Sequence, residues 1–226
     1  MSNKFFESPF FKKISLLADF FLVSLYFLIC SIPVLTLFPA LCASYYAMAK
    51  AIRYHSGDTT TSAFFQGFRM NLKQGIVLSL LTIIGIVILY TMYDVARGVG
   101  LGTLYGKVYL ILIPVYSIVF FALLIAVVPI VSRFNIKLLS AFKLSFSFIR
   151  RHPFRMLTYC IAFAGICALG FVIPPLSLVL PGGFMYSLTF LMEPMLVEYM
   201  ADHPEEAGKI PSWLEEEVSK YHEQQK

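Results

Sequence analysis

Charged residues are scarce in this chain of 226 residues, where Asp, Glu, Lys and Arg together make up only 14%. Soluble domains carry about 25%. Hydrophobic residues reach 58%, so a soluble globule would lack the charge to cover its surface. The same composition excludes a disordered chain, which needs low hydrophobicity and high charge. With only four cysteines, a disulfide-rich secreted module is excluded as well.

Motifs for metal, nucleotide and redox chemistry are also missing. The four cysteines all lie inside apolar stretches and form no CxxC pair, and the four histidines form no HExxH motif. No GxxxxGK[ST] sequence is present, so the chain lacks the loop that binds ATP phosphates in P-loop enzymes. These absences predict a protein that is not an enzyme and that has no cofactor and no metal site.

Long apolar runs are the feature that the sequence has in abundance. Six of them approach or reach the roughly 20 residues that a helix needs to cross a bilayer: 14–31, 36–52, 75–93, 108–131, 156–172 and 183–200. They predict an all-α, polytopic helical membrane protein with a membrane domain over residues 1–201 and a tail over 202–226. The second run would be about 25 Å long, against a hydrocarbon core of about 30 Å. Its length therefore leaves a full crossing and a re-entrant segment both open.

Basic residues favour the full crossing. If all six segments cross from a cytoplasmic N-terminus, every Lys and Arg up to residue 200 faces the cytoplasm except Arg97 and Lys107. Without the second crossing, the four basic residues between positions 50 and 73 would face the wrong side. We therefore expect a multi-pass protein of the cell membrane with both termini in the cytoplasm. The chain has a net charge of +5, but its basic residues lie mainly between apolar runs, so they indicate orientation in the lipid bilayer and no nucleic-acid partner.

Two of the predicted cytoplasmic connections, 60–73 and 137–151, do not read as plain loops. Both mix Phe and Leu with basic residues at near-helical spacing, which is typical of amphipathic helices that lie in a membrane interface. They also resemble each other, because the tripeptide Ser-Ala-Phe occurs at 62–64 and again 78 residues later. We call these two segments the cytoplasmic elbows. The basic residues at the ends of the elbows, with the one that follows the second elbow, are Arg69, Lys73, Arg150, Arg151 and Arg155.

Three carboxylates on the predicted segments form a candidate intramembrane polar site: Asp19, Glu193 and Glu198. Charged side chains at membrane depth are costly and often mark functional positions. Glu193 precedes Pro194, which frees backbone carbonyls inside a helix and can help to line a cavity. The other interpretation is that these carboxylates pair with nearby basic residues. Those residues are Lys12, Lys13 or an elbow for Asp19, and Arg150, Arg151 or Arg155 for the two glutamates.

The tail differs from the rest of the chain in its charge, with three basic and seven acidic residues over 201–226. Ser212 and Glu215 have the spacing of a capping box at the start of a short helix. One face of that helix would carry Trp213, Leu214, Val218 and Tyr221. This face would either fold onto the basic elbows of the same chain or serve as a docking handle for a partner.

The stretch from residue 16 to residue 74 resembles the YesL family of bacterial membrane proteins. That family has a first span that ends in a proline-containing turn and is followed by an aromatic and basic elbow. The matching residues are Ser31-Ile32-Pro33-Val34-Leu35-Thr36, Pro39-Ala40, Tyr45, Tyr46, Ala63-Phe64-Phe65 and Asn71-Leu72-Lys73-Gln74. The chain departs from the family at Leu37-Phe38, where a small pair is common, and at Asp19, where Asn or another polar residue is usual.

The resemblance implies a role beside carbohydrate import in a Gram-positive bacterium. Members of the family are typically encoded alongside binding-protein-dependent carbohydrate importers and the sensor kinases that regulate them. It therefore implies a non-catalytic accessory or regulatory subunit, with the permease subunits of a sugar ABC transporter or a sensor kinase as partner. No catalytic residue is carried over, whereas Pro33, Thr36 and Pro39 are carried over as the residues that shape the turn. The alternative is an autonomous small-solute transporter or channel that uses its intramembrane carboxylates.

Overall fold

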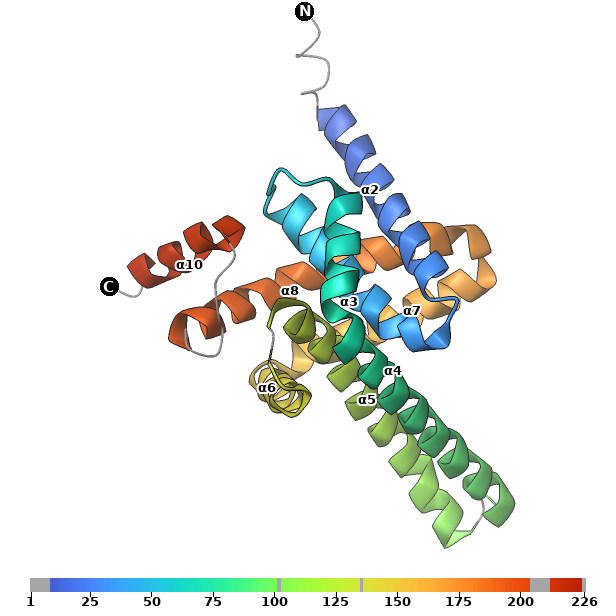
Figure 1. Cartoon of the computed structure of the whole chain (residues 1–226). Helices are drawn as coiled ribbons and strands as arrows, with labels where there is room; N and C mark the ends of the chain where they lie inside the picture. The colour runs from blue at the N-terminus through green and yellow to red at the C-terminus, as the bar shows by residue number, and fades with distance from the viewer. Residues whose placement is uncertain (1–8, 101–102, 135, 204–211, 225–226) are drawn as a thin grey trace, which may run out of the picture.

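The computed structural model describes residues 9–100, 103–134, 136–203 and 212–224, and over these ranges it contains helices and no strand (Figure 1). In chain order the helices are α2 (Pro9–Cys30), η1 (Val34–Thr36), α3 (Leu37–Ala47), η2 (Met48–Arg53), α4 (Thr60–Val99), α5 (Leu104–Arg133), α6 (Leu138–Arg151), α7 (Pro153–Val172), η3 (Pro174–Leu178), α8 (Leu180–Asp202) and α10 (Ser212–Gln224). The elements η1 and η3 are 3₁₀ turns, and η2 is a π-helix.

Five of these helical stretches are long and apolar enough to cross a membrane: Lys13–Cys30, Val34–Arg53, Thr60–Val99, Leu104–Arg133 and Pro153–Val172. The prediction of an all-α membrane protein with several spanning helices is therefore confirmed. The second segment is a continuous helical stretch of 20 residues, which is longer than predicted and reaches about 30 Å at 1.5 Å per residue. The sixth predicted segment, in α8, is not among the five, so a count of six stays a prediction.

The first elbow is not a separate element, which corrects the sequence-based prediction. Residues 60–73 form the beginning of α4, a single helix of 40 residues that extends about 60 Å. The Thr59 side chain accepts a hydrogen bond from the Ser62 N–H at the start of this helix. No proline follows until α4 has ended, and the next break is Gly100, with φ of 86°. Nothing in the local sequence therefore divides the elbow from the membrane segment.

The second elbow is a separate amphipathic helix, α6, as predicted. It begins at Leu138, 78 residues after the start of α4, which is the same offset as between the two Ser-Ala-Phe tripeptides. Pro153 ends it, because a proline has no N–H for the helix and restricts the backbone of the residue before it. His152 accordingly leaves the helical conformation, with φ of −134° and ψ of 60°. One proline thus separates elbow and membrane helix here.

The core is built around α3, which packs closely along the first half of α4. Two glycines of α4 allow the close approach. A Cβ atom on Gly75 would lie 2.6 Å from the ring of Pro39, and one on Gly67 would lie 2.9 Å from the Cβ of Tyr46. Small residues at helix contacts are typical of membrane proteins, because van der Waals packing replaces the hydrophobic driving force between helices.

The second central helix is α8, in which more than half of the residues are buried. Its N-terminal turn meets α2, where the Gly182 N–H donates to the Ser24 hydroxyl at 2.8 Å. A Cβ atom on Gly182 would lie 2.5 Å from the carbonyl oxygen of Phe20. Because other helices surround much of α8, it does not need the continuous apolar surface that contact with lipid demands.

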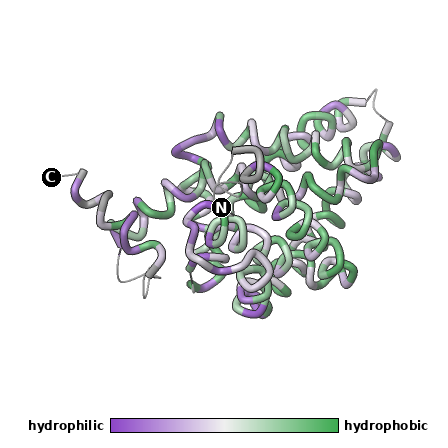
Figure 2. Tube along the Cα trace, turned by 90° about the horizontal axis from the view of Figure 1, so that it is seen from above, coloured by the Kyte–Doolittle hydropathy of each residue, from purple (hydrophilic) through white to green (hydrophobic). Residues whose placement is uncertain are grey.

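The distal halves of α4 and α5 run side by side away from the rest of the molecule, toward the lower right of Figure 1. The Tyr116 hydroxyl on α5 donates to the Gly85 carbonyl on α4 at 3.1 Å. The outer surface of this hairpin consists mainly of exposed aliphatic side chains. Figure 2 shows hydrophobic residues over most of the body and hydrophilic residues gathered mainly toward the side of the tail helix α10. This distribution is consistent with contact between the apolar helices and a lipid bilayer.

Candidate functional site

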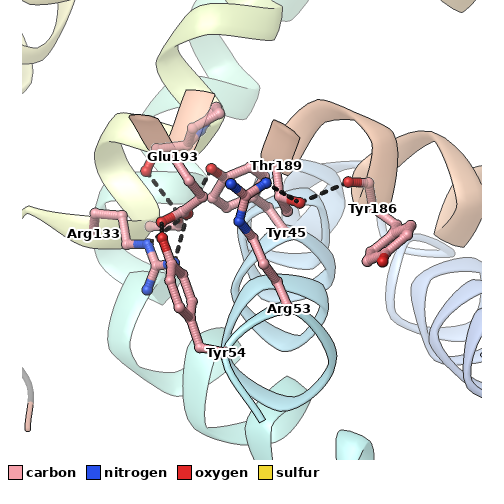
Figure 3. A network of polar contacts seen from close by, with 9 residues as sticks. Tyr45, Arg53, Tyr54, Arg133, Tyr186, Thr189 and Glu193 are labelled. Carbon is pink, nitrogen blue, oxygen red and sulfur yellow. Dashed lines mark hydrogen bonds and ion pairs between the residues drawn. The ribbon is translucent and has the colours of Figure 1, made fainter. Parts of the chain in front are cut away.

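The most deeply buried carboxylate in the described part of the chain is Glu193 on α8, which has 0% exposure. Three side chains from other elements converge on it (Figure 3). Its Oε1 accepts hydrogen bonds from the Tyr45 hydroxyl at 2.7 Å and from the Arg133 guanidinium, whose Nε lies at 3.0 Å. Its Oε2 accepts from the Tyr54 hydroxyl at 2.9 Å. We call these four residues the Glu193 cluster.

The π-helix η2 explains why both tyrosines reach the same carboxylate. Residues nine apart in an α-helix project to opposite sides, because each residue turns the helix by about 100°. Here the Tyr54 N–H donates to the Ala49 carbonyl, five residues earlier, at 3.0 Å. This wider turn rotates the chain less per residue, so Tyr54 lies on the same side as Tyr45. π-turns of this kind occur frequently at functional sites.

Aromatic rings enclose the cation of the cluster. Arg133 is the last residue of α5, where a positive charge is also favoured by the helix dipole. Its guanidinium lies 4.3 Å from the ring centroid of Trp213. The ring centroids of Tyr45, Tyr46 and Tyr54 are 5.8 to 6.0 Å away, which is about the longest distance of a cation–π contact. Its Nη1 is buried and has no hydrogen-bond partner among the described residues. The ion pair between α5 and α8 is therefore enclosed by residues of α3, of the end of η2 and of α10.

Tyr54 lies just beyond the second membrane segment and acts as a donor. Burial, and after it the adjacent Glu193 carboxylate, raises the pKa of Tyr54 well above that of a free tyrosine. The phenol therefore stays protonated, and its O–H donates a hydrogen bond to the Glu193 carboxylate. Deprotonation would place two negative groups at hydrogen-bond distance in a buried site.

A second arginine lies on the other side of Glu193. Arg53, the last residue of η2, donates from Nη1 to the Thr189 hydroxyl at 3.4 Å. Its guanidinium lies 4.8 Å from the ring centroid of Phe190 and 5.8 Å from that of Tyr54. Thr189 in turn donates to the Tyr186 carbonyl at 2.7 Å (Figure 3). Arg53 thus extends the polar network along α8 toward its surface.

The other two carboxylates of the candidate polar site are not part of this cluster. Glu198 forms an ion pair with Arg151 at 3.3 Å, and both side chains are largely exposed. Asp19 accepts a hydrogen bond from the Thr60 hydroxyl at 2.6 Å. It has no ion pair with Lys13 or with an elbow residue in the described part of the chain, and the Lys12 side chain lies outside that part. Asp19 borders an open cleft of about 650 Å³ between α2, η2 and the start of α4.

The three turn residues shared with the YesL family connect α2 to α3. Pro33 precedes η1, and the Thr36 hydroxyl lies 2.5 Å from the Cys30 carbonyl and 2.7 Å from the Pro33 carbonyl. One of the carbonyls that the end of α2 leaves without a helical partner is satisfied in this way. Pro39 is buried against Gly75, and the nearby Phe38 N–H donates to the Ser79 hydroxyl of α4 at 3.2 Å.

The basic elbow residues all lie on the surface. Arg69 and Lys73 are exposed on α4, Arg150 and Arg151 at the end of α6, and Arg155 at the start of α7. Among the described residues, Arg151 is the one of these five that forms an ion pair. Nor do the described residues contain a group of three His, Cys, Asp or Glu side chains that could hold a metal ion.

The tail helix α10 packs against its own chain, mainly against α8. Leu214 and Val218 are buried, and Tyr221 lies against the same core. Trp213 covers the Arg133 guanidinium and also lies against Tyr46 and Tyr54, with ring centroids 6.3 and 5.2 Å away. The predicted docking face is therefore occupied within the chain, and it closes one side of the Glu193 cluster.

Docking of α10 can be followed through Trp213, the only tryptophan in the chain. We expect Leu214→Asp to release the helix, because a charge cannot be buried at a site with 0% exposure. The emission of Trp213 would move to longer wavelength, and acrylamide would quench it more strongly. Ser219→Ala, on the exposed side of α10, is the matched control and should leave both quantities unchanged. An unchanged spectrum in Leu214→Asp would contradict the docked position.

Arg133, Tyr45 and Tyr54 were not predicted as partners of Glu193. A usable signal was present, because a phenol inside an apolar segment needs a hydrogen-bond partner. Tyr45, which lies inside the second segment, therefore indicated an acceptor at the same depth, whereas Tyr54 lies beyond that segment. The partner arginine could not be selected in this way, because several cytoplasmic arginines were equally available by topology.

Comparison with known proteins finds one family model that matches part of the chain. The model of the family DUF624, described as a protein of unknown function, matches residues 20–93. This region includes the second half of α2, the turn, α3, η2 and most of α4, and hence Tyr45 and Tyr54 but not Arg133 or Glu193. No curated protein and no solved structure matches the chain. The resemblance to the YesL-like proteins, which belong to the DUF624 family, is therefore confirmed, with residues 20–93 as the matching region.

Proposed function

We propose that this protein is a non-catalytic accessory or regulatory subunit of a bacterial carbohydrate uptake system of the ABC type. It would lie in the cell membrane with both termini in the cytoplasm. Its partners would be the permease subunits of a sugar transporter or a sensor kinase. The connection to carbohydrate import rests on the YesL resemblance, whereas the non-catalytic part of the proposal rests on the geometry of the Glu193 cluster.

The observation that carries the proposal is the complete engagement of Glu193. Both carboxylate oxygens accept hydrogen bonds from within the protein, and the side chain has 0% exposure. A carboxylate that couples solute or ion movement has to meet that solute or ion in a cavity. Glu193 instead joins α8 to α3, to the end of η2 and to α5, as expected of a residue that maintains a scaffold. The basic residues on the surface of α4, α6 and α7 remain available for contacts with other molecules.

Affinity purification at native expression level tests the proposal. The tagged protein is extracted in mild detergent in three forms, the full chain, the chain without residues 203–226, and Leu214→Asp, and co-purifying proteins are identified by mass spectrometry. We expect permease subunits or a sensor kinase to be recovered with the full chain. A deletion strain should also show impaired sugar uptake. Recovery of the chain alone, together with normal uptake of every sugar tested, would overturn the proposal.

The cleft beside Asp19 favours a second candidate, an autonomous transporter of small polar solutes. Its volume of about 650 Å³ is within the range of small-molecule sites, and Asp58 and several hydroxyl side chains also line it. If this candidate is correct, purified protein in liposomes will carry solute across the membrane, and the variant Asp19→Asn will abolish this flux. Glu198→Gln, which changes an exposed carboxylate, is the control and should leave the flux intact.

A further inference from the structure

A small cavity lies between α7 and α8, close to the start of α7. Its volume is about 280 Å³, and it is lined by Arg155, Thr158 and Tyr159 of α7 and by Phe190 and Leu191 of α8. The hydroxyls of Thr158 and Tyr159 already donate to the carbonyls of Phe154 and Ser187. The Arg155 guanidinium is therefore the group at this cavity that remains available to donate hydrogen bonds to a ligand.

One arginine lines this cavity and a second contacts one of its lining residues, and neither has a carboxylate partner in the described part of the chain. Arg155 lines the cavity and is exposed. Arg53 lies over the ring of Phe190, 4.8 Å from its centroid, and Phe190 lines the same cavity. Arg133 and Arg151, by contrast, are paired with Glu193 and Glu198. Two cations without a carboxylate partner thus lie near Phe190, so the site favours a ligand that brings negative charge.

The surface next to this cationic site is apolar. On α7, Phe154 is 84% exposed and Ile161 is 65% exposed, with Leu157 between them at 41%. On α8, Phe190 is 56% exposed. Exposed apolar side chains thus lie beside Arg155, with Phe154 next to it in sequence and Phe190 at the same cavity. A ligand that satisfies both surfaces must have an anionic group at one end and long apolar chains at the other.

We propose that this junction of α7 and α8 binds an anionic phospholipid. The phosphodiester accepts hydrogen bonds from Arg155 and is attracted by Arg53, and an acyl chain lies along the exposed ring of Phe190. Basic pockets between membrane helices at the membrane surface bind anionic headgroups in this way. The exposed ring of Phe154 lies at the level of the headgroups, where aromatic side chains are enriched. This inference does not depend on the proposed function.

Lipid binding to the full chain tests the proposal. The purified protein is delipidated in detergent and titrated with phosphatidylglycerol or with phosphatidylcholine, and bound lipid is counted by native mass spectrometry. We expect phosphatidylglycerol to be preferred. Arg155→Gln and Arg53→Gln should each weaken its binding by roughly fivefold, since one basic residue near the surface contributes about 1 kcal/mol. Emission of Trp213 identical to that of the unaltered protein would show that each variant is folded.

Arg97→Gln is the matched control, because Arg97 lies at the far end of the α4–α5 hairpin and has no carboxylate partner among the described residues. It should bind phosphatidylglycerol like the unaltered chain. Equal weakening by Arg97→Gln, or equal binding of the two lipids, would overturn the proposal, because the attraction would then be nonspecific. Displacement of the lipid by millimolar inorganic phosphate would also overturn it, because the site would then recognise a free anion.

Discussion

A Glu193→Ala variant is expected to lose about 3 to 5 kcal/mol of the free energy of unfolding, because it leaves the Arg133 guanidinium buried without a counter-charge. The side chain of Arg133 has only 2% exposure, and that of Glu193 has none. The substitution also removes the acceptor for two buried phenols, Tyr45 and Tyr54. Unfolding in mixed micelles of a mild detergent and SDS, followed by Trp213 emission, measures the loss.

Two variants separate this explanation from a general effect of losing a carboxylate. Glu198→Ala breaks an exposed ion pair and should cost less than about 1 kcal/mol. Replacing both members of the buried pair, with Met at position 133 and Leu at position 193, should recover much of the loss, because no buried charge then remains unpaired. Similar losses in Glu193→Ala and Glu198→Ala would show that the ion pair is not buried in the membrane-embedded protein.

Gly75→Val is expected to be strongly damaging at the contact between α3 and α4. The Cβ that it adds would lie 2.6 Å from the ring carbons of Pro39 and 2.7 Å from the Pro39 backbone nitrogen. Neither a proline ring nor a backbone atom can rotate away, so α3 and α4 would have to separate. We expect a loss of about 3 kcal/mol, the upper end of the usual cost of overpacking, in the same unfolding assay.

Gly165→Ala is the matched control for this prediction. Gly165 also lies inside a membrane helix, α7, but no heavy atom lies within 4 Å of its added Cβ. Because Ala favours a helix over Gly by about 1 kcal/mol, this variant should unfold at the same or a higher SDS fraction. Equal destabilisation by both substitutions would contradict the close contact at Pro39.

The sequence by itself determined the class of the protein. Low charge and long apolar runs indicate a chain embedded in a bilayer. There the backbone N–H and C=O groups can form all their hydrogen bonds only in helices or in a closed barrel, and the length of the runs selects helices. Single residues in the sequence also set the ends of several helices: Pro153 separates α6 from α7, and α10 begins at Ser212. The predicted boundary between the first elbow and the third segment was wrong, because no residue between Thr60 and Val99 breaks a helix.

The tertiary structure alone decided which charges meet. Periodicity places Glu193 on a helix but does not say which of the arginines approaches it, since that depends on how α5 crosses α8. The participation of Tyr54 depends further on the π-turn in η2, a change of register that hydrophobic spacing does not encode. The same limit applies to the tail helix, because its amphipathic pattern predicts only that its apolar face will pack against another surface. Only the packed structure shows that the covering residue is Trp213 and that the covered group is Arg133.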